Sequence, residues 1–252
     1  MSDLFDLSNC KALVTGASGG IGGAIADGLH AAGAQLVVHG TTDAIHAVAA
    51  RLGRGGPACA GLTADLTDRA QRRGLFEQAL ESAGGLDILV LAHGVIHRAP
   101  AEAYPLAEWD RTLDLNLTSA FELSQLAARH MLPKGRGKLI AVASVVSFQG
   151  GFTVPAYAAS KGGLRMLIMA LCNEWAARGV NVNGIAPGYI ATRFNATLRE
   201  DPVRNRQIVE RIPAGRWGTP DDLKGAAVFL ASRASDYVHG SILAVDGGWL
   251  AR

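Results

Sequence analysis

Short, almost uninterrupted apolar segments alternate with longer amphipathic segments along most of this chain, and no other feature constrains its fold as much. Each apolar segment ends at Gly, Asp or Ser, and the seven segments are KALVTG, AQLVVHG, ACAGLTAD, LDILVLAHG, GKLIAVAS, VNVNGIAPG and SILAVDGG. Continuous apolar strands are typical of a parallel sheet that helices cover on both faces. The alternation therefore predicts an α/β fold with a doubly wound parallel sheet of seven strands.

The amphipathic segments between these strands predict helices over residues 21–32, 44–52, 69–83, 106–131, 156–178 and 220–232. Residues 189–217 break the alternation, because they are polar and rich in arginine. Long connections in compact domains are usually lids or binding loops, and ligands of such sheets bind beyond the carboxyl ends of the strands. We therefore expect this insertion to cover a substrate, within a single domain of residues 1–252.

Composition argues against several classes of partner. The net charge is +2 and the basic residues are scattered, so we expect no nucleic-acid partner. The longest apolar run, residues 88–92, is far shorter than the ~20 residues that cross a bilayer, so we expect no membrane partner. The three cysteines, Cys10, Cys59 and Cys172, show no metal-ligand spacing, and we expect free thiols and no metal. The N-terminus lacks a signal-peptide pattern, and we expect a cytoplasmic location.

The segment VTGASGGIG, which joins the first predicted strand to the first predicted helix, indicates a dinucleotide site. Gly16 permits a tight turn, Gly20 lets the backbone approach a diphosphate, and Gly22 allows close helix packing. The N-terminus of the helix offers unpaired N–H groups to an anion. The place of this segment, between a strand and a helix, strengthens the interpretation.

The glycine spacing T-G-x-x-x-G-x-G, from Thr15 to Gly22, resembles that of the short-chain dehydrogenase/reductase family. The match extends through YAASK and PGYIAT to the terminal VDGG and so covers nearly the whole chain. It implies a single-domain Rossmann fold, an NAD(P)-dependent oxidoreductase acting on CH–OH groups, and a homotetramer or homodimer. The cofactor-binding residues that it implies are Gly16, Ser18, Gly20, Ile21, Gly22, Gly40, Thr41, Asp65, Leu66, Ala92, Gly94, Tyr157, Lys161, Pro187, Gly188, Ile190 and Thr192.

Tyr157 and Lys161 lie four residues apart in a predicted helix and project from one face. A free tyrosine titrates near ~10 and a nearby cation lowers that pKa, so we expect Lys161 to make Tyr157 a usable proton donor and acceptor. The resemblance adds Ser144, thirteen residues before Tyr157, as the catalytic serine, and Asn116 as a helical residue whose bound water is linked to Lys161. The implied reaction is reversible hydride transfer between the nicotinamide and a carbinol or ketone carbon.

The end of the second predicted strand, HGTTD, bears on the choice of cofactor. Gly40 stands where NAD-preferring members usually carry Asp, and Thr41 stands where NADP-preferring members often carry Arg. Because no carboxylate repels a 2′-phosphate and the hydroxyls of Thr41 and Thr42 are potential donors, the sequence favours NADP(H) slightly over NAD(H). Alternatively, both threonines merely begin a loop and helix.

Within the family, the resemblance is most specific to sugar-acid dehydrogenases that act on 2-dehydro-3-deoxy-D-gluconate and 2-deoxy-D-gluconate, and it rests on SVVSFQGG, VPAYAASK and RIPAGRWG. A hexonate needs a cation for its carboxylate, and the planar fork of arginine suits it. Arg98 is the first candidate, with Arg193 and Arg216 behind it. The polar side chains predicted to bind substrate are Ser144, Ser147, Gln149, Tyr157 and Tyr189, with Phe148 and Trp217 as apolar walls.

Two histidines end predicted strands. We expect His39 to face solvent, with stacking on the adenine as the alternative. His93 follows a strand whose usual Asn-Asn-Ala-Gly ending is here Leu-Ala-His-Gly, and we expect a structural or cofactor-adjacent role, with substrate contact as the alternative. The tail after Gly248 carries Trp249, and we expect it to be exposed and to pack on a neighbouring subunit.

Two other functions stay open. A 3-oxoacyl carrier-protein reductase would carry the same catalytic residues and would need a basic patch at the mouth of the site. A cofactor-binding regulator without catalysis is the alternative from another class. The complete set of Asn116, Ser144, Tyr157 and Lys161 argues against a regulator.

Overall fold

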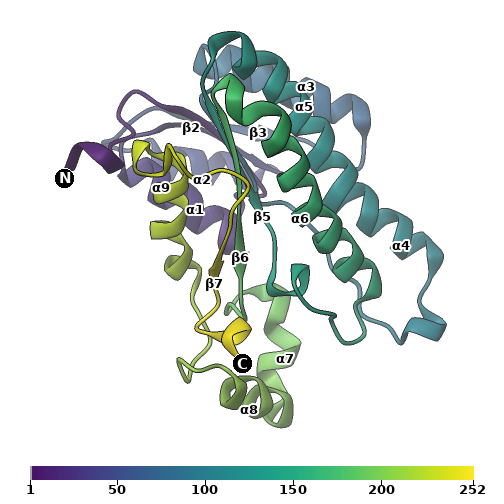
Figure 1. The fold of residues 1–252 in the computed structure, drawn as a ribbon. Helices are drawn as coiled ribbons and strands as arrows, with labels where there is room; N and C mark the ends of the chain where they lie inside the picture. The colour runs from purple at the N-terminus through teal and green to yellow at the C-terminus, as the bar shows by residue number, and fades with distance from the viewer. Residues whose placement is uncertain (1) are drawn as a thin grey trace.

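The computed structural model describes residues 2–252 of the chain, and its side chains from residue 4 onward. All strand pairs are parallel and form one sheet in the order β3-β2-β1-β4-β5-β6-β7 (Figure 1). The strands are β1 (Lys11–Thr15), β2 (Gln35–Gly40), β3 (Cys59–Thr63), β4 (Ile88–Leu91), β5 (Gly137–Val142), β6 (Val180–Pro187) and β7 (Ile242–Val245). The predicted seven-stranded, doubly wound α/β fold is confirmed.

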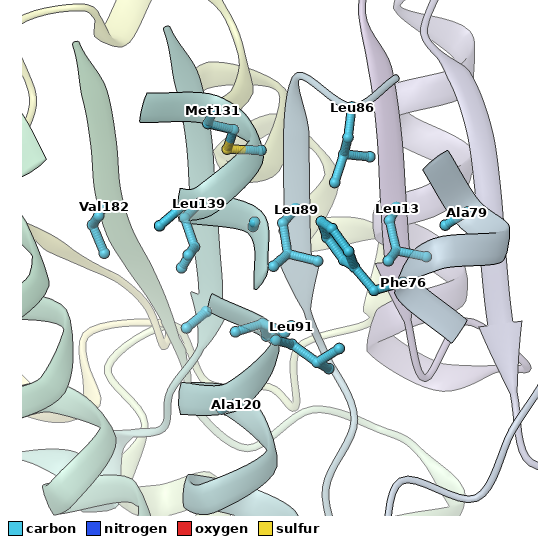
Figure 2. Close-up of a cluster of buried hydrophobic side chains, with 14 of the residues drawn as sticks. Leu13, Phe76, Ala79, Leu86, Leu89, Leu91, Ala120, Met131, Leu139 and Val182 are labelled. Atoms are coloured by element: carbon cyan, nitrogen blue, oxygen red, sulfur yellow. The ribbon is translucent and has the colours of Figure 1, made fainter. Parts of the chain in front are cut away.

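Successive residues of each strand point to opposite faces of the sheet, which explains why the strands are apolar throughout. On one face, Leu13, Leu89 and Leu139 pack against α3 (Arg69–Ala83), α5 (Ser119–Met131) and α6 (Pro155–Trp175). Figure 2 shows this core, in which Phe76 and Met131 reach from the helices toward the strands. On the other face, Val14, Val90 and Ile140 pack against α1 (Gly20–Ala31), α2 (Ala44–Leu52) and α9 (Lys224–Ala231).

The helix predicted over residues 106–131 is interrupted. It consists of α4 (Leu106–Leu113), a π-helical turn over Asp114–Thr118, and α5. The N–H of Ser119 donates to the carbonyl of Asp114, five residues earlier. One additional residue in a helical turn leaves the pattern of apolar residues nearly unchanged. The π-helical turn could therefore not be predicted from the sequence. π-helical turns within helices are often found at functional sites.

The insertion over residues 189–217 contains two helices that the sequence analysis did not predict, α7 (Ala196–Glu200) and α8 (Pro202–Arg211). The Asp201 carboxylate caps α8 by accepting from the N–H groups of Val203 and Arg204. Figure 1 shows α7 and α8 beside the C-terminus, beyond the ends of β6 and β7. The insertion therefore lies at the end of the sheet where ligands of such folds bind.

The expectation of an exposed apolar tail is wrong, because Trp249 is only 4% exposed. Its ring packs with Ile208 and Ile212 of the insertion and with Val145, which follows β5. The chain thus covers its own terminal tryptophan. No helix in the part of the chain that the structure describes is long and apolar enough to cross a membrane.

Candidate active site

The strand order reverses between β1 and β4, because β2 and β3 lie on one side of β1 and the later strands lie on the other. The loops that follow β1 and β4 meet at this point. Gly16 follows β1 with a φ of 67°, and a Cβ at this position would lie 2.8 Å from both N and Cα of His93, which follows β4. A Cβ at Gly22 would overlap the carbonyl oxygen of Gly16. Only glycines allow this close turn.

The start of α1 fits the diphosphate of a dinucleotide. Gly19 precedes the helix, no side chain caps it, and the space around its missing Cβ is open. Unpaired N–H groups at the N-terminus of a helix attract anions. A Cβ at Gly20 would lie 3.6 Å from Cγ2 of Thr192, so the structure brings the predicted cofactor segments at residues 16–22 and 187–192 together.

His39 does not face solvent, contrary to expectation. The residue is 1% exposed and its ring lies beneath the glycine-rich turn. Nδ1 accepts from the N–H of Gly16 at 3.3 Å, and Nε2 donates to the carbonyl of Ala64 at 3.0 Å. Burial lowers the pKa of His39, which keeps the ring neutral and able to accept at Nδ1. His39 therefore joins the turn after β1 to the end of β3.

Three predicted cofactor residues gather at the end of β2. A Cβ on Gly40 would lie 3.2 Å from Cβ of Ser18, and both Ser18 and Thr41 are exposed. No acidic side chain stands at Gly40, and the two exposed hydroxyls can donate to an anion. This corner accommodates an additional phosphate without repulsion.

The end of β3 holds the predicted adenine segment. The Asp65 carboxylate accepts from the N–H and the hydroxyl of Thr67, which lowers the pKa of Asp65. The Leu66 side chain is buried in the core. Its carbonyl accepts from Nε of Arg72 at 2.6 Å, and this buried guanidinium also pairs with Asp114 and Glu122.

Tyr157 and Ser144, on α6 and after β5, come together as predicted. A side-chain hydrogen bond joins them, and Oγ of Ser144 also accepts from the N–H of Val146 at 3.3 Å. Burial raises the pKa of Tyr157, whereas the hydrogen bond from Ser144 and the charge of Arg98 oppose that rise. The phenol is therefore protonated at neutral pH and can donate a proton.

Lys161 lies on the same face of α6 as Tyr157, with Nζ 5.8 Å from the centre of the Tyr157 ring. The ammonium donates to the carbonyl of Val142 at 2.7 Å, and burial lowers the pKa of Lys161 to about 8. The cation that opposes the raised pKa of Tyr157 in this arrangement is Arg98, and the expected effect of Lys161 on Tyr157 stays a prediction.

Asn116 lies in the π-helical turn and is 2% exposed. Its amide makes reciprocal hydrogen bonds with the backbone of Val95, at 2.8 and 2.9 Å, and Nδ2 also donates to Oγ of Ser160 at 3.1 Å. A Cβ on Gly94 would lie 3.1 Å from Oδ1 of Asn116 and 3.9 Å from Nζ of Lys161. The structure therefore brings the four predicted catalytic residues and the turn after β4 into one site.

Arg98 is half-buried beside Tyr157 and Tyr189, and burial lowers the pKa of its guanidinium. Its hydrogen bond to Oδ1 of Asn195 is long, at 3.4 Å. Within residues 4–252 no carboxylate forms an ion pair with Arg98. Arg98 is thus a partly desolvated cation with capacity for an anionic ligand.

The competing arginines differ. Arg216 forms a two-point ion pair with Asp222, at 2.8 and 3.0 Å, so its guanidinium is already engaged and its candidacy for the substrate carboxylate is not supported. Arg193 is exposed.

The other predicted substrate contacts lie in the segments that follow β5 and β6. Oγ of Ser147 accepts from the N–H of Ser144, and Gln149 accepts from Arg211 at 3.4 Å. Tyr189 packs against Trp217 and Trp249, with ring centres 5.4 and 4.6 Å apart. Phe148 lies beneath the guanidinium of Arg165, whereas Phe194 of the insertion lies 6.3 Å from the Tyr157 ring. The insertion thus approaches the site through Phe194 and Asn195.

Several residues of the site were missed. Ser160 bonds Asn116, Ser119 bonds His93, and Arg72 holds the backbone of Leu66. Ser160 lies within YAASK and could have been noticed there. Nothing local in the sequence links Ser119 or Arg72 to the site, because their partners lie on other elements.

Comparison with known proteins agrees with this geometry. The matching family model is described as enoyl-(acyl carrier protein) reductase and spans residues 16–250. A 2-dehydro-3-deoxy-D-gluconate 5-dehydrogenase of Bacillus subtilis (strain 168) is 48% identical over 252 residues, which cover 100% of this chain and 99% of the relative. The protein of the same name from Escherichia coli (strain K12) is 46% identical, with 98% of each chain covered.

A solved structure is also similar. A gluconate 5-dehydrogenase from Burkholderia cenocepacia J2315, in complex with NADP and tartrate, is 40% identical and has a TM-score of 0.96, with 100% of this chain and 99% of that chain covered. At this identity the likeness extends beyond the fold alone.

Proposed function

Because the chain belongs to the short-chain dehydrogenase/reductase family, we propose that it transfers hydride reversibly between a nicotinamide cofactor and a secondary alcohol or ketone of a sugar acid. The names of its relatives support a substrate of the 2-dehydro-3-deoxy-D-gluconate type, with 2-deoxy-D-gluconate as a related possibility. The observation that carries the proposal is Arg98, a partly buried cation beside Tyr157 that forms no ion pair with a carboxylate of residues 4–252. A sugar carboxylate bound there would bring the rest of the substrate to the phenol.

The residues that would hold the cofactor line the ends of the strands. The open N-terminus of α1 would receive the diphosphate, Ser18 and Thr41 a 2′-phosphate, and Asp65 the adenine end. The segment from Pro187 to Thr192 would hold the nicotinamide end. When bound, the cofactor supplies or accepts the hydride.

We propose a preference for NADP(H). The support is the missing carboxylate at Gly40 and the two exposed hydroxyls beside it, since an acidic residue there would repel the 2′-phosphate. The related gluconate 5-dehydrogenase was crystallised with NADP, which is consistent with this preference.

The proton is handled by the chain's own residues. Tyr157, protonated at neutral pH, would donate its phenolic proton to the ketone oxygen and take it back in the oxidation direction. Ser144 would donate to the same oxygen and hold it against the phenol. Lys161 and Asn116 would connect this step to a water and then to solvent. Arg98 would bind the carboxylate and also stabilise the phenolate.

We further propose that the chain forms a homo-oligomer through α5 and α6. Met166 and Met169 of α6 are 60% and 40% exposed, and Phe121 of α5 is 41% exposed. Such apolar side chains on neighbouring helices favour burial against a second copy.

The deciding experiment is a screen of NADPH and NADH oxidation against ketone-bearing sugar acids and an acetoacetyl thioester. We expect turnover with a sugar acid. Turnover with the thioester alone would instead identify a 3-oxoacyl carrier-protein reductase. Tight NADPH binding without turnover of any ketone would point to a cofactor-binding regulator.

A further inference from the structure

His93 spans three elements of the fold. Its ring follows β4, Nδ1 lies 2.7 Å from Oγ1 of Thr15 at the end of β1, and Nε2 lies 2.7 Å from Oγ of Ser119 at the start of α5. Both nitrogens are engaged within the chain. Contact of His93 with substrate, the alternative considered from the sequence, would require breaking one of these bonds.

The other contacts of Ser119 and Thr15 decide which atoms donate and which accept in this series of hydrogen bonds. The hydroxyl of Ser119 donates to the carbonyl of Leu115 at 2.6 Å, so toward His93 it can only accept, and Nε2 must carry the proton. In a neutral ring Nδ1 then accepts from the hydroxyl of Thr15, whose proton takes the 2.7 Å contact with Nδ1 over the longer 3.1 Å contact with the carbonyl of Val90. Burial lowers the pKa of His93 to about 3, and the neighbouring charges of Lys161 and Arg72 act in the same direction.

At the Ser119 end, this series of hydrogen bonds reaches the residue before Asn116, the candidate catalytic asparagine. Leu115 precedes Asn116 in the π-helical turn, and the Ser119 hydroxyl bonds the Leu115 carbonyl from one turn later. Serine hydroxyls that bond back to a carbonyl in this way distort helices. His93 holds Ser119 in the position from which it does so.

The other end reaches the glycine-rich turn. Oγ1 of Thr15 also accepts from the N–H of Ala92 at 3.1 Å, and Gly16, the next residue, lies directly against the backbone of His93. The usual asparagines of this segment are Leu91 and Ala92 here. The side chains of Leu91 and Ala92 are apolar and cannot bond β1. The imidazole of His93 therefore supplies a side-chain hydrogen bond between β1 and the segment after β4.

We infer that His93 is a positioning residue that connects the cofactor turn to the turn bearing Asn116, through Thr15 on one side and Ser119 on the other. The inference has two parts. The first part concerns Asn116 and catalysis, and it rests on the proposed function. The second part concerns Gly16 and predicts an effect on cofactor affinity alone. The two parts can be separated because each nitrogen of the ring serves one of them.

Two substitutions separate the nitrogens. Asparagine in place of His93 offers an acceptor near Nδ1 and cannot reach Ser119, whereas glutamine offers a donor near Nε2 and is displaced from Thr15. We expect His93→Asn to lower kcat about tenfold with NADPH affinity within about twofold, because one buried hydrogen bond is lost on the catalytic side. We expect His93→Gln to weaken NADPH binding about tenfold with kcat at saturating NADPH nearly unchanged.

Ser119→Ala and Thr15→Val remove the same two bonds from the partner side, together with the bond of Ser119 to Leu115 and the bonds of Thr15 to Val90 and Ala92. They should show the same separation of kcat from NADPH affinity as His93→Asn and His93→Gln, respectively, with losses at least as large. Equal losses of kcat and NADPH affinity in both His93 variants, in proportion to a lowered Tm, would overturn the inference and leave a general structural role. Unchanged values in both variants would also overturn it.

A measurement on the unmodified chain remains decisive if a variant does not fold. Long-range ¹H–¹⁵N correlation spectra should show His93 as the neutral Nε2–H form at pH 5, and its resonances are distinguished from those of the buried His39 by their loss in His93→Gln. A His93 ring that becomes charged by pH 5 would refute the assignment. NADPH affinity and these resonances need no sugar-acid turnover, so failure of the proposed function would appear separately, as an inactive wild-type chain.

Discussion

Arg98 and Tyr157 interact through space: burial raises the pKa of the Tyr157 phenol and lowers the pKa of the Arg98 guanidinium, and the charges of the two groups oppose both shifts. One cation thus lies within reach of both the proton donor and an incoming anion. Lys161, the expected partner, instead donates to a backbone carbonyl.

Replacing Arg98 with methionine should raise KM for the sugar acid about 100-fold, because a charge-assisted hydrogen bond to a carboxylate contributes about 2–3 kcal/mol. The rising limb of alcohol oxidation against pH should also move to higher pH, since loss of the cation raises the pKa of Tyr157. Initial-rate kinetics from pH 6 to 10 measure both effects. The matched control is Arg193→Met on the exposed arginine nearby; a larger effect there would transfer the carboxylate site to Arg193.

Tyr157→Phe should reduce turnover by about 10²–10⁴-fold, the usual contribution of a general acid, and leave NADPH affinity within about twofold. We expect turnover to be lost while NADPH still quenches the fluorescence of the protein, which reports cofactor binding. Tyr237→Phe, at a fully exposed tyrosine, is the control. An active Tyr157→Phe enzyme would eliminate the phenol as the proton donor.

Thr41→Asp should weaken NADPH binding at least tenfold and change NADH binding little, because an added carboxylate repels the 2′-phosphate. Thr41→Asn is nearly isosteric with this variant and carries no charge, so it isolates the electrostatic effect. The side chain at position 41 is exposed, and neither substitution should lower Tm appreciably. Equal weakening of both cofactors would place the 2′-phosphate elsewhere.

Stability should fall as the pH is lowered from 7 to 5, in part because of His93. The pKa of His93 is about 3 in the folded chain and about 6.5 when unfolded, so between these values the unfolded chain binds the additional proton. This group should remove about 2 kcal/mol from the free energy of unfolding between pH 7 and pH 5. Urea unfolding of wild type and His93→Gln at both pH values measures the free energy of unfolding, and wild type should lose more of it than the variant between pH 7 and pH 5. An equal loss in both proteins would show that His93 titrates normally when folded.

Met166→Lys should reduce the oligomer to a smaller species by placing a charge in the proposed contact between copies. Sedimentation or light scattering detects the change in mass. Gln78→Lys adds the same charge to an exposed position of α3 and should have no effect. An unchanged mass in Met166→Lys would exclude this face of α6 as the contact.

The sequence by itself determined the sheet and the identity of the candidate catalytic residues. Strand segments such as residues 88–91 are apolar because both faces of the sheet are covered, and glycines such as Gly16 mark turns whose requirements are local. Both signals are contained in a few neighbouring residues. For this reason all seven strands occur where they were expected.

The tertiary structure alone decided which polar groups meet. His39 was expected in solvent and lies beneath Gly16, 23 residues away in the chain, and His93 bonds Thr15 across 78 residues. The π-helical turn at Asn116 and the choice of Arg98 over Arg216 likewise depend on partners from other segments. A hydrogen bond or ion pair depends on distance in space, which local sequence patterns do not specify. These contacts separate the structural histidine His93 from Tyr157, the candidate proton donor beside Arg98.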